Sequence, residues 1–347
     1  MRNEVKEMKK VVGFGDFIVR LSPPGYERFI QANSFNINYT GAEANVLVSL
    51  AQMGVKTEFV TRLPNNAIAK AALSQLNKYG VRTDLVAFGG ERMGIFYCEK
   101  GASQRPSKIV YDRKFTSICE AKYEDFDWDA IFEGAGHFHI TGITPALSPN
   151  MAEVCLKACE EAERRGLIVS CDLNYRKLMW TPEQAKATME KIVPKVHTLI
   201  ANEEDAEKVL GIKARNTDVT SGKLDREGYA DVARQICEKY GCRQVAVSLR
   251  KSITASDNEW GIMLYTGGQA YYSRTYKIHI VDRVGGGDSF AAGLIYSLLQ
   301  GFDPQHTVEY AAAASCLKHS IEMDFNLCTP DEIELLAGGD GSGRVQR

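Results

Sequence analysis

One segment near the C-terminus combines three glycines with two acids, and this combination could bind and transfer a phosphoryl group. Asp282 and Asp288 stand on either side of Gly285, Gly286 and Gly287. Three glycines allow backbone N–H groups to converge, and a helix that begins beside them attracts phosphate through its partial positive charge. Phosphoryl transfer needs positioning, charge neutralisation and a carboxylate that takes the hydroxyl proton. We therefore predict an anion hole at the three glycines, with Asp288 as the general base.

A helix must follow this segment if its N-terminus is to face the phosphoryl group. Apolar side chains recur every four residues at Phe290, Leu294 and Leu298, and Gly301 closes the run. This pattern predicts a helix opened by the glycine loop. The alternative interpretation is a flexible turn in which Asp288 serves only as the N-cap of that helix. The spacing alone leaves both interpretations open.

The rest of the chain alternates short β-rich runs with helical patterns. This alternation predicts a doubly wound α/β fold, with a mostly parallel sheet covered by helices on both faces. The length of 347 residues allows one large domain with a small one. The predicted strands are Val11–Gly13, Glu58–Thr61, His137–Ile140, Ile168–Asp172, Thr198–Ala201 and Gln244–Leu249. The clearest predicted helices are Pro149–Arg165, Pro182–Val193 and Tyr229–Tyr240.

Two segments break this alternation, residues 17–40 and residues 93–115. They have few helix formers, carry proline and glycine, and alternate polar with apolar or aromatic residues. We predict that they supply strands outside the main sheet, which form a small β lid over its carboxyl edge, where ligands of open sheets bind. One catalytic domain is expected over residues 10–335, with flexible tails at 1–9 and 338–347.

The composition narrows the classes of partner. Lys plus Arg number 42 against 44 Asp plus Glu, so the net charge is −2 and the basic excess of a nucleic-acid binder is missing. The nine cysteines lack the paired CxxC spacing of a structural zinc site and are expected to be reduced thiols. The charged N-terminus has no apolar leader, and no stretch is long enough to cross a membrane. We expect a cytoplasmic protein that acts on small molecules.

The segment from Asp282 to Asp288 resembles the C-terminal signature of the ribokinase-like (pfkB) carbohydrate kinases, usually written DTxGAGD. It departs from that signature at Arg283 and Val284, where a threonine pair is usual, and at Gly286, where alanine is usual. The resemblance implies a ribokinase-like fold and ATP as the phosphoryl donor. It also implies that Asp288 is the catalytic base and that Asp282 holds a substrate hydroxyl.

A second motif near the N-terminus reads Tyr-Thr-Gly-Ala-Glu-Ala-Asn over residues 39–45, and an apolar helical run follows it. The motif resembles the substrate-side motif of the same family, so Gly41, Ala42 and Asn45 are expected against the sugar. Taken alone, it could equally be a helix start with an asparagine near the cap. The order and separation of the two motifs favour the family interpretation.

Further segments, at residues 19–25, 110–113, 172–176 and 317–326, resemble one branch of this family, the kinases of 2-keto-3-deoxygluconate (2-dehydro-3-deoxygluconate). The resemblance covers nearly the whole chain. The substrate of that branch carries a carboxylate, and an arginine fork binds a carboxylate bidentately. Arg113 and Arg176 are the expected partners, with Tyr111 beside them, and the alternative for each arginine is a surface salt bridge. The branch often has two tyrosines before its arginine, whereas Asp112 stands there in this chain, which leaves the sugar-acid preference open.

The predicted lid has two further consequences. Either Phe96 or Tyr97 is expected to line the substrate pocket, because neighbouring residues of a strand point to opposite faces. The edge strands of the lid could also pair across a homo-oligomer.

Shorter matches mark the nucleotide side. Residues 202–205, Asn-Glu-Glu-Asp, resemble the NxxE motif of the family with a shorter acid at the end. The resemblance implies Asn202 near the nucleotide and Asp205 near Mg²⁺ through a water molecule. The alternative is a solvated acidic helix start. A monovalent cation is a further candidate cofactor. The resemblance places these residues near ATP: Ser248, Arg250, Gly285, Gly287, Lys318 and Asn326.

Three rival functions follow from the same residues. A kinase for fructose or ribose would give Arg113 and Arg176 no charge to pair with. A sugar-acid or nucleotide sensor would bind without turnover, and the presence of both Asp282 and Asp288 argues against it. An NAD-dependent dehydrogenase lacks its fingerprint, since Ile18 stands where GxGxxG needs its last glycine.

Overall fold

The computed structural model describes residues 9–214 and 226–343. Its centre is a ten-stranded sheet with the order β15-β14-β13-β12-β11-β10-β1-β4-β6, in which β16 also pairs with β14. Neighbouring pairs from β13 to β6 are parallel, and the pairs made by β14 are antiparallel. The strands are β1 (Lys10–Phe14), β4 (Thr57–Val60), β6 (Val81–Arg82), β10 (Ala135–Thr141), β11 (Ile168–Asp172), β12 (Thr198–Ala201), β13 (Gln244–Ser252), β14 (Asp257–Thr266), β15 (Gln269–Tyr272) and β16 (Tyr276–His279).

The chain winds in two directions from β1. After β1 it adds β4 and β6 on one side, and it then returns to place β10 on the other side, before β11, β12 and β13 follow outward. This reversal leaves a crevice at the carboxyl ends of β1 and β10, which is where open α/β sheets bind their ligands. Asp16 and Ile143, which follow these two strands, line the cavity described below.

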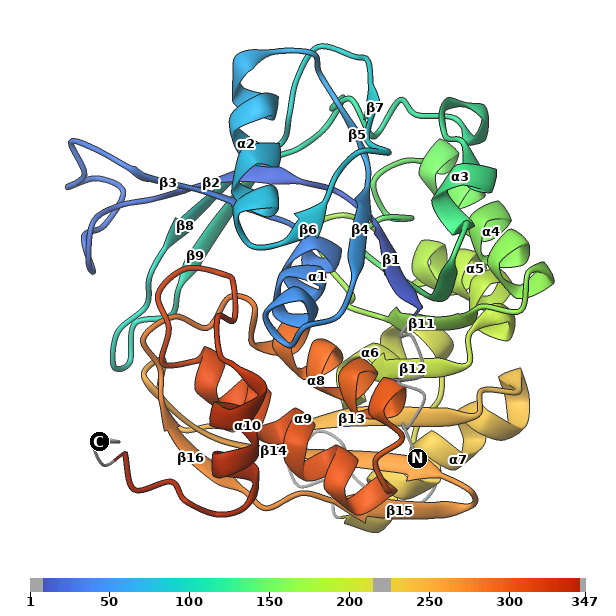
Figure 1. Cartoon of the computed structure of the whole chain (residues 1–347). Coiled ribbons are helices and arrows are strands. Elements are labelled where there is room, and N and C mark those ends of the chain that lie inside the picture. Colours follow the sequence, from blue (N-terminus) through green and yellow to red (C-terminus); the bar gives the residue numbers. More distant parts are fainter. Residues whose placement is uncertain (1–8, 215–225, 344–347) are drawn as a thin grey trace, which may run out of the picture.

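Helices cover both faces of the main sheet because its central strands carry apolar side chains on both faces. Val12 and Leu199 belong to one buried core, and their chain neighbours Val11 and Ile200 belong to the other. Figure 1 shows the helices grouped on the two sides of the strands. The first core is covered by α3 (Trp128–Phe132), α4 (Pro149–Arg164), α5 (Pro182–Ile192), α6 (Glu203–Leu210) and α7 (Arg226–Tyr240). The second is covered by α1 (Ala42–Gln52), α2 (Ala67–Lys78), α8 (Gly286–Gln300), α9 (Pro304–Lys318) and α10 (Pro330–Ala337).

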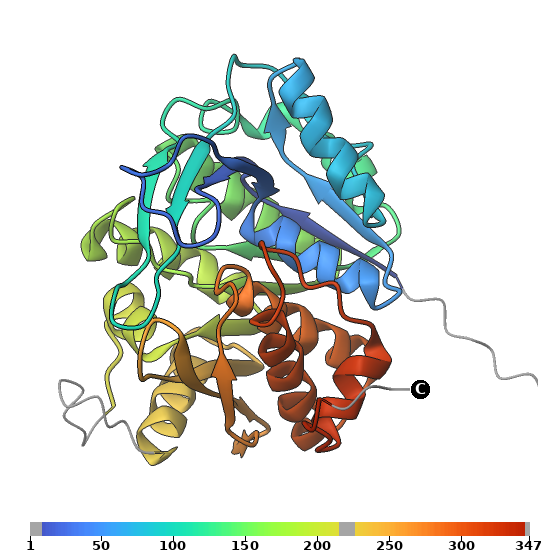
Figure 2. The ribbon, with the colours of Figure 1, turned by 90° about the vertical axis from the view of Figure 1, so that its left-hand side faces the viewer.

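Four strands outside the main sheet form a second sheet in the order β3-β2-β8-β9. They are β2 (Ile18–Ser22), β3 (Asn36–Thr40), β8 (Ile95–Glu99) and β9 (Lys108–Asp112). Figures 1 and 2 show these blue and teal strands standing apart from the main sheet. Each predicted lid segment supplies two of the strands, and we call this second sheet the lid. A short pair, β5 (Arg62–Leu63) and β7 (Ala87–Phe88), lies outside both sheets.

The predicted fold class is confirmed, since the main sheet is mostly parallel and helices cover both of its faces. Each predicted strand and helix coincides with an observed element within a few residues. The antiparallel edge formed by β14, β15 and β16 was not among the predicted strands. The tails predicted at 1–9 and 338–347 lie partly outside the described residues. Within residues 9–214 and 226–343, no helix is both long and apolar enough to cross a membrane.

Candidate active site

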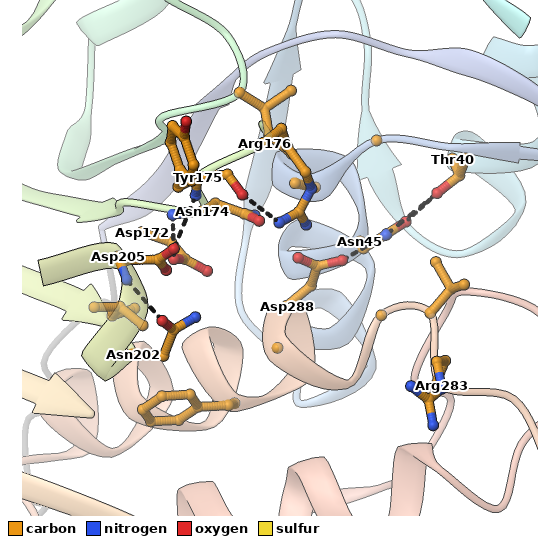
Figure 3. Close-up of a pocket in the computed structure, with 18 of the residues that line it drawn as sticks. Thr40, Asn45, Asp172, Asn174, Tyr175, Arg176, Asn202, Asp205, Arg283 and Asp288 are labelled. Atoms are coloured by element: carbon orange, nitrogen blue, oxygen red, sulfur yellow. Dashed lines mark hydrogen bonds between the residues drawn. The ribbon is translucent and has the colours of Figure 1, made fainter. Parts of the chain in front are cut away.

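A cavity of about 850 Å³ lies between the carboxyl ends of the parallel strands and the lid. Its walls come from the loops after β1, β10, β11 and β12, from lid strands β8 and β9, and from the first turns of α1 and α8. Cavities of this volume hold small molecules in other proteins. Figure 3 shows polar side chains from these separate elements gathered around one space.

Asp288 lies in the first turn of α8 and contacts a residue in the first turn of α1. Its Oδ2 accepts a hydrogen bond of 2.7 Å from Nδ2 of Asn45 (Figure 3). The same Asn45 nitrogen lies 3.3 Å from the hydroxyl of Thr40. Burial raises the pKa of Asp288 from 3.8 to about 6, while the Asn45 hydrogen bond and the charge of Arg176 act in the opposite direction. A carboxyl group with this pKa can exchange a proton near neutral pH.

The three glycines before Asp288 differ in backbone conformation and in whether they line the cavity. Gly285 has a φ of +84°, in the left-handed region that favours glycine, and a Cβ there would lie 1.9 Å from the carbonyl oxygen of Asp324. Gly285 and Gly287 line the cavity, beside the positive end of α8. Gly286 does not line it, and its N–H donates to the carbonyl oxygen of Arg283 at 3.3 Å. A share of Gly286 in the anion hole stays a prediction.

The lid supplies an aromatic wall and a cation. The rings of Phe96 and Tyr111 stack with their centroids 5.6 Å apart, and both line the cavity. The guanidinium of Arg113 lies 5.1 Å from the centre of the Tyr111 ring and donates to Oδ2 of Asp16 at 2.6 and 3.2 Å. Of the two aromatic residues considered for this wall, Phe96 lines the cavity and Tyr97 does not.

Two acids, the buried Asp205 and the partly buried Asp172, and one arginine lie where β11 and β12 end. Burial raises the pKa of Asp205 from 3.8 to about 7. Burial also raises the pKa of Asp172 well above its usual value, with a further contribution from the charge of Asp205. Arg176 acts against both shifts, and it donates to the carbonyl oxygen of Tyr175 at 3.2 Å (Figure 3). The charge of Arg176 acts on Asp288 in the same way as on Asp172 and Asp205.

A further group of cavity residues is polar or cationic. Arg250 and Ser248, near the end of β13, line the cavity together with Asn202 and Arg283. Burial lowers the pKa of Arg283, and the positive charge of Arg250 lowers it further. Two arginines that repel one another beside the N-terminus of α8 would be stabilised by a polyanion.

Three residues that were expected to contact ligands lie outside the cavity. Asp282 is 3% exposed, and its Oδ2 accepts a hydrogen bond of 2.8 Å from Arg20. Lys318 is fully buried and donates to the carbonyl oxygen of Asp282 at 3.3 Å. Asn326 is 1% exposed and donates to the hydroxyl of Ser289 at 2.6 Å. In this structure each side chain supports the segments behind the glycine loop, and their contacts with the substrate or the nucleotide stay predictions.

The other expected residues all line the cavity: Gly41, Ala42, Asn45, Tyr111, Arg113, Arg176, Asn202, Asp205, Ser248 and Arg250. Many lining residues were not predicted as site residues, among them the acids Asp16, Glu43 and Asp172. Asp16 follows β1 and Asp172 ends β11, so both stand at carboxyl ends of parallel strands. The rule that open sheets bind ligands at this edge is the signal that could have found them.

Glu43 lies in the second motif, between Gly41 and Asn45, and is 1% exposed. Its Oε1 accepts hydrogen bonds from the backbone and hydroxyl of Thr141, both at 2.9 Å, and from the hydroxyl of Thr144 at 2.7 Å. Its Oε2 is buried without a hydrogen-bond partner among the described residues. Burial raises the pKa of Glu43 from 4.5 to about 7, against the effect of these hydrogen bonds. Glu43 therefore titrates in the neutral range.

Comparisons with known proteins agree with this fold. The pfkB family of carbohydrate kinases matches residues 8–321. The crystal structure of 2-dehydro-3-deoxygluconokinase from Thermotoga maritima is 51% identical, with a TM-score of 0.92, over 95% of this chain and 98% of that chain. The 2-dehydro-3-deoxygalactonokinase of Haloferax volcanii is 30% identical over 95% of this chain and 98% of its own. The 2-dehydro-3-deoxygluconokinase of Bacillus subtilis is 27% identical over 88% of each chain.

A doubly wound sheet with a β lid, and a cavity in which an acid stands at a glycine-opened helix, defines a phosphotransferase that acts on small molecules. The chain belongs to the pfkB family of carbohydrate kinases, and its fold is ribokinase-like. It is a sugar kinase, an enzyme that transfers a phosphoryl group to an alcohol.

Replacing Glu43 should change how stability depends on pH. A carboxyl group whose pKa is raised on folding, here from 4.5 to about 7, stabilises the fold at low pH and loses that contribution as the pH rises through this range. Glu43→Gln keeps the shape and cannot ionise. We expect the parent to lose about 2–3 kcal/mol more than this variant between about pH 5 and pH 8, at about 1.4 kcal/mol per pKa unit. Urea denaturation at both pH values measures the difference.

The matched control for this experiment is Glu160→Gln, which changes an exposed glutamate of α4. It should keep the pH dependence of the parent. An equal pH dependence in Glu43→Gln and the parent would contradict the assignment of a raised pKa to Glu43.

Proposed function

We propose that this enzyme transfers the γ-phosphoryl group of ATP to the 6-hydroxyl of 2-keto-3-deoxygluconate and so makes 2-keto-3-deoxy-6-phosphogluconate. One observation carries the proposal: a single cavity holds an acid at a helix N-terminus, Asp288, together with two arginines, Arg113 and Arg176. The 51% identical enzyme from Thermotoga maritima, a 2-dehydro-3-deoxygluconokinase, supports the same acceptor.

In the proposed reaction Asp288 is the general base. It takes the proton of the acceptor hydroxyl as the oxygen attacks the γ-phosphorus in line, so the O–H bond breaks while the new P–O bond forms and ADP leaves. Asn45 orients the carboxylate through its 2.7 Å hydrogen bond. Backbone N–H groups at Gly285, Gly287 and the first turn of α8 stabilise the negative charge of the transferring group.

The two arginines are proposed to bind the carboxylate of the sugar acid. Arg176 has its guanidinium in the cavity, with one hydrogen bond at 3.2 Å to a carbonyl oxygen, so its remaining donors can serve a ligand. Arg113 is held against Asp16 and over Tyr111, which fixes the direction of its fork. A neutral sugar would leave both charges without a counterion from the substrate.

The nucleotide is proposed to lie along Asn202, Ser248, Arg250 and Arg283, toward the glycine loop. Carbohydrate kinases of this family use ATP. The described residues contain no group of three His, Cys, Asp or Glu side chains able to hold a metal ion. Such a lining suits a Mg²⁺ ion carried mainly by phosphates and water, with Asp205 contacting it through a water molecule. Bound there, Mg²⁺ would neutralise charge on the phosphates.

The need for a monovalent cation stays a prediction, and turnover in K⁺ compared with turnover in tetramethylammonium measures it.

Two other proposals rest on fewer observations. The exposed edge strand β9 offers unpaired backbone groups for a homo-oligomer formed through the lid. All nine cysteines lie in the described residues as thiols without a disulfide, which supports a reducing, cytoplasmic location.

A second acceptor has a specific observation in its favour. The Haloferax volcanii relative, 30% identical, is a 2-dehydro-3-deoxygalactonokinase. 2-Keto-3-deoxygalactonate differs from 2-keto-3-deoxygluconate in the configuration at C4 and carries the same carboxylate. Both arginines would therefore bind either acid, and only contacts to the C4 hydroxyl would separate them.

The function is tested by measuring ADP release with the two keto-deoxy acids, gluconate, fructose and ribose. We expect the fastest turnover with 2-keto-3-deoxygluconate.

We expect Arg176→Gln to lower kcat/KM for that acid by about 10- to 100-fold, because a hydrogen bond to a charged group contributes about 1.5–3 kcal/mol. Arg234→Gln, an arginine of α7 that pairs with Asp231 and Glu238 outside the cavity, is the matched control and should retain kcat/KM.

Faster turnover with the galactonate acid would move the assignment to that epimer while keeping the role of the arginines. Turnover only with fructose or ribose would overturn the carboxylate-binding role. Binding of ATP or a sugar acid without ADP release would point to a sensor.

The role of Asp288 has its own test. Asp288→Asn keeps the size of the side chain but removes its basicity, so kcat should fall by about 10²- to 10⁴-fold, the usual contribution of general acid–base catalysis. The control is Asp331→Asn, which changes an exposed acid in the first turn of α10. If purified, folded Asp288→Asn turned over at the parental rate, Asp288 would not be the base.

A further inference from the structure

Arg20 on lid strand β2 is fully buried, and each nitrogen of its guanidinium has a partner. Nε donates to the hydroxyl of Ser22 at 3.0 Å, Nη2 donates to Oδ2 of Asp282 at 2.8 Å, and Nη1 donates to Asp324. Burial opposes the charged form, but the charges of Asp324 and Asp282 raise the pKa of Arg20 above its usual value. Arg20 is therefore a fixed cation between two carboxylates.

Asp282 connects this cation to the backbone of the glycine loop. Its Oδ1 accepts the N–H of Val284 at 3.1 Å, and Val284 directly precedes Gly285. Its carbonyl oxygen accepts a hydrogen bond of 3.3 Å from Lys318. Because one carboxylate bonds both Arg20 and the loop, the position of Arg20 sets the position at which the loop begins.

Asp324 supports the same loop by direct contact. Its carbonyl oxygen lies 1.9 Å from the place that a Cβ of Gly285 would occupy, so backbone meets backbone there. Its carboxylate also acts on the base: besides burial, which is the main cause, the charge of Asp324 raises the pKa of Asp288. Arg20 offsets that charge through its ion pair with Asp324.

Arg20 is also at the centre of the lid. It pairs with Phe96 in the ladder between β2 and β8, and with Asn38 in the ladder between β2 and β3. Its guanidinium lies 6.0 Å from the centre of the Phe96 ring, which lines the cavity. One side chain thus contacts the wall of the substrate cavity and the segments that hold the glycine loop.

We propose that Arg20 is a positioning residue for phosphoryl transfer, which fixes the lid and the glycine loop relative to each other so that Asp288 and the loop N–H groups meet the transferring group. The proposal rests on the proposed role of Asp288 and goes beyond it, since Arg20 does not line the cavity.

A purely structural role is the competing explanation. A buried cluster of charges is weak support for stability, because well-packed apolar residues of similar volume often stabilise a fold as much or more. Removing one partner from such a cluster nevertheless destabilises a protein strongly. A useful test must therefore separate stability from catalysis.

The first variant is Arg20→Lys, which keeps the positive charge but loses the planar fork that reaches three partners. We expect kcat to fall by about 10²-fold, as small misplacements of a catalytic site do, with KM for ATP and for the acceptor near the parental values. Amide hydrogen exchange over residues 284–287 should become faster. Arg105→Lys is the matched control, because Arg105 bonds buried Glu99 on the lid at 3.0 Å, away from the loop.

The second variant combines Arg20→Met with Asp282→Asn and Asp324→Asn, which removes all three charges together. We expect stability in urea to recover relative to Arg20→Met alone, while kcat stays low because the fork is gone. Recovery of kcat together with stability would show a purely structural role and overturn the proposal. Parental kcat and parental exchange in a folded Arg20→Lys protein would overturn it as well.

The choice of acceptor does not decide this test. Each variant is compared with the parent on whichever sugar acid or sugar the parent phosphorylates fastest. A wrong substrate assignment therefore leaves the ratio intact, and the exchange measurement needs no substrate. A fall in kcat on any acceptor, with faster exchange over residues 284–287, supports the proposal.

Discussion

The hydrogen bond between Asn45 and Asp288 joins the first turns of two helices that are 243 residues apart in the sequence. Both helices begin at a glycine, Gly41 before α1 and Gly285 before α8, and both first turns border the cavity. The two strongest motifs of the chain therefore meet at one 2.7 Å contact. The reversal of strand order at β1 makes this meeting possible, because it opens a crevice at the carboxyl edge of the sheet.

Charge around this contact is arranged so that an acid can act as a base near neutral pH. Burial raises the pKa of Asp288, Asp205 and Asp172, and Arg176 limits the shift at each of them. The cavity thus combines a proton acceptor with cations that can bind both ends of the proposed reaction, the sugar acid and the nucleotide. Arg20 lies outside the cavity and is the counterion of two carboxylates near the glycine loop, Asp282 and Asp324.

The sequence predicted the parallel sheet and most cavity residues because both leave local signals. In the sequence, a buried parallel strand appears as a short apolar run. The N-terminus of the helix appears as glycine followed by an acid. Asp282 and Lys318 are buried behind the glycine loop, and no local pattern in the sequence indicates this, because a motif shows which residues act together but not which of them line the cavity. Asp282 pairs with Arg20, 262 positions away in the chain, and long-range pairing of this kind has no local signature. The antiparallel strands β15 and β16 were missed since edge strands are only partly buried and mix polar with apolar residues.

The pH dependence of kcat/KM in the parent and in Asn45→Ala tests the central claim most directly. Asp288 must be ionised to act as a base, so kcat/KM of the parent should rise with pH through the pKa of about 6. The charged groups that act on Asp288 include Arg176, Lys318, Asp324 and Asp172, and this variant leaves them in place. The hydrogen bond from Asn45 lowers the pKa of Asp288. Its loss should therefore raise that pKa and move the rising limb to higher pH. An unmoved limb, or a rate independent of pH between about 5 and 8, would contradict the role of Asp288 as the general base.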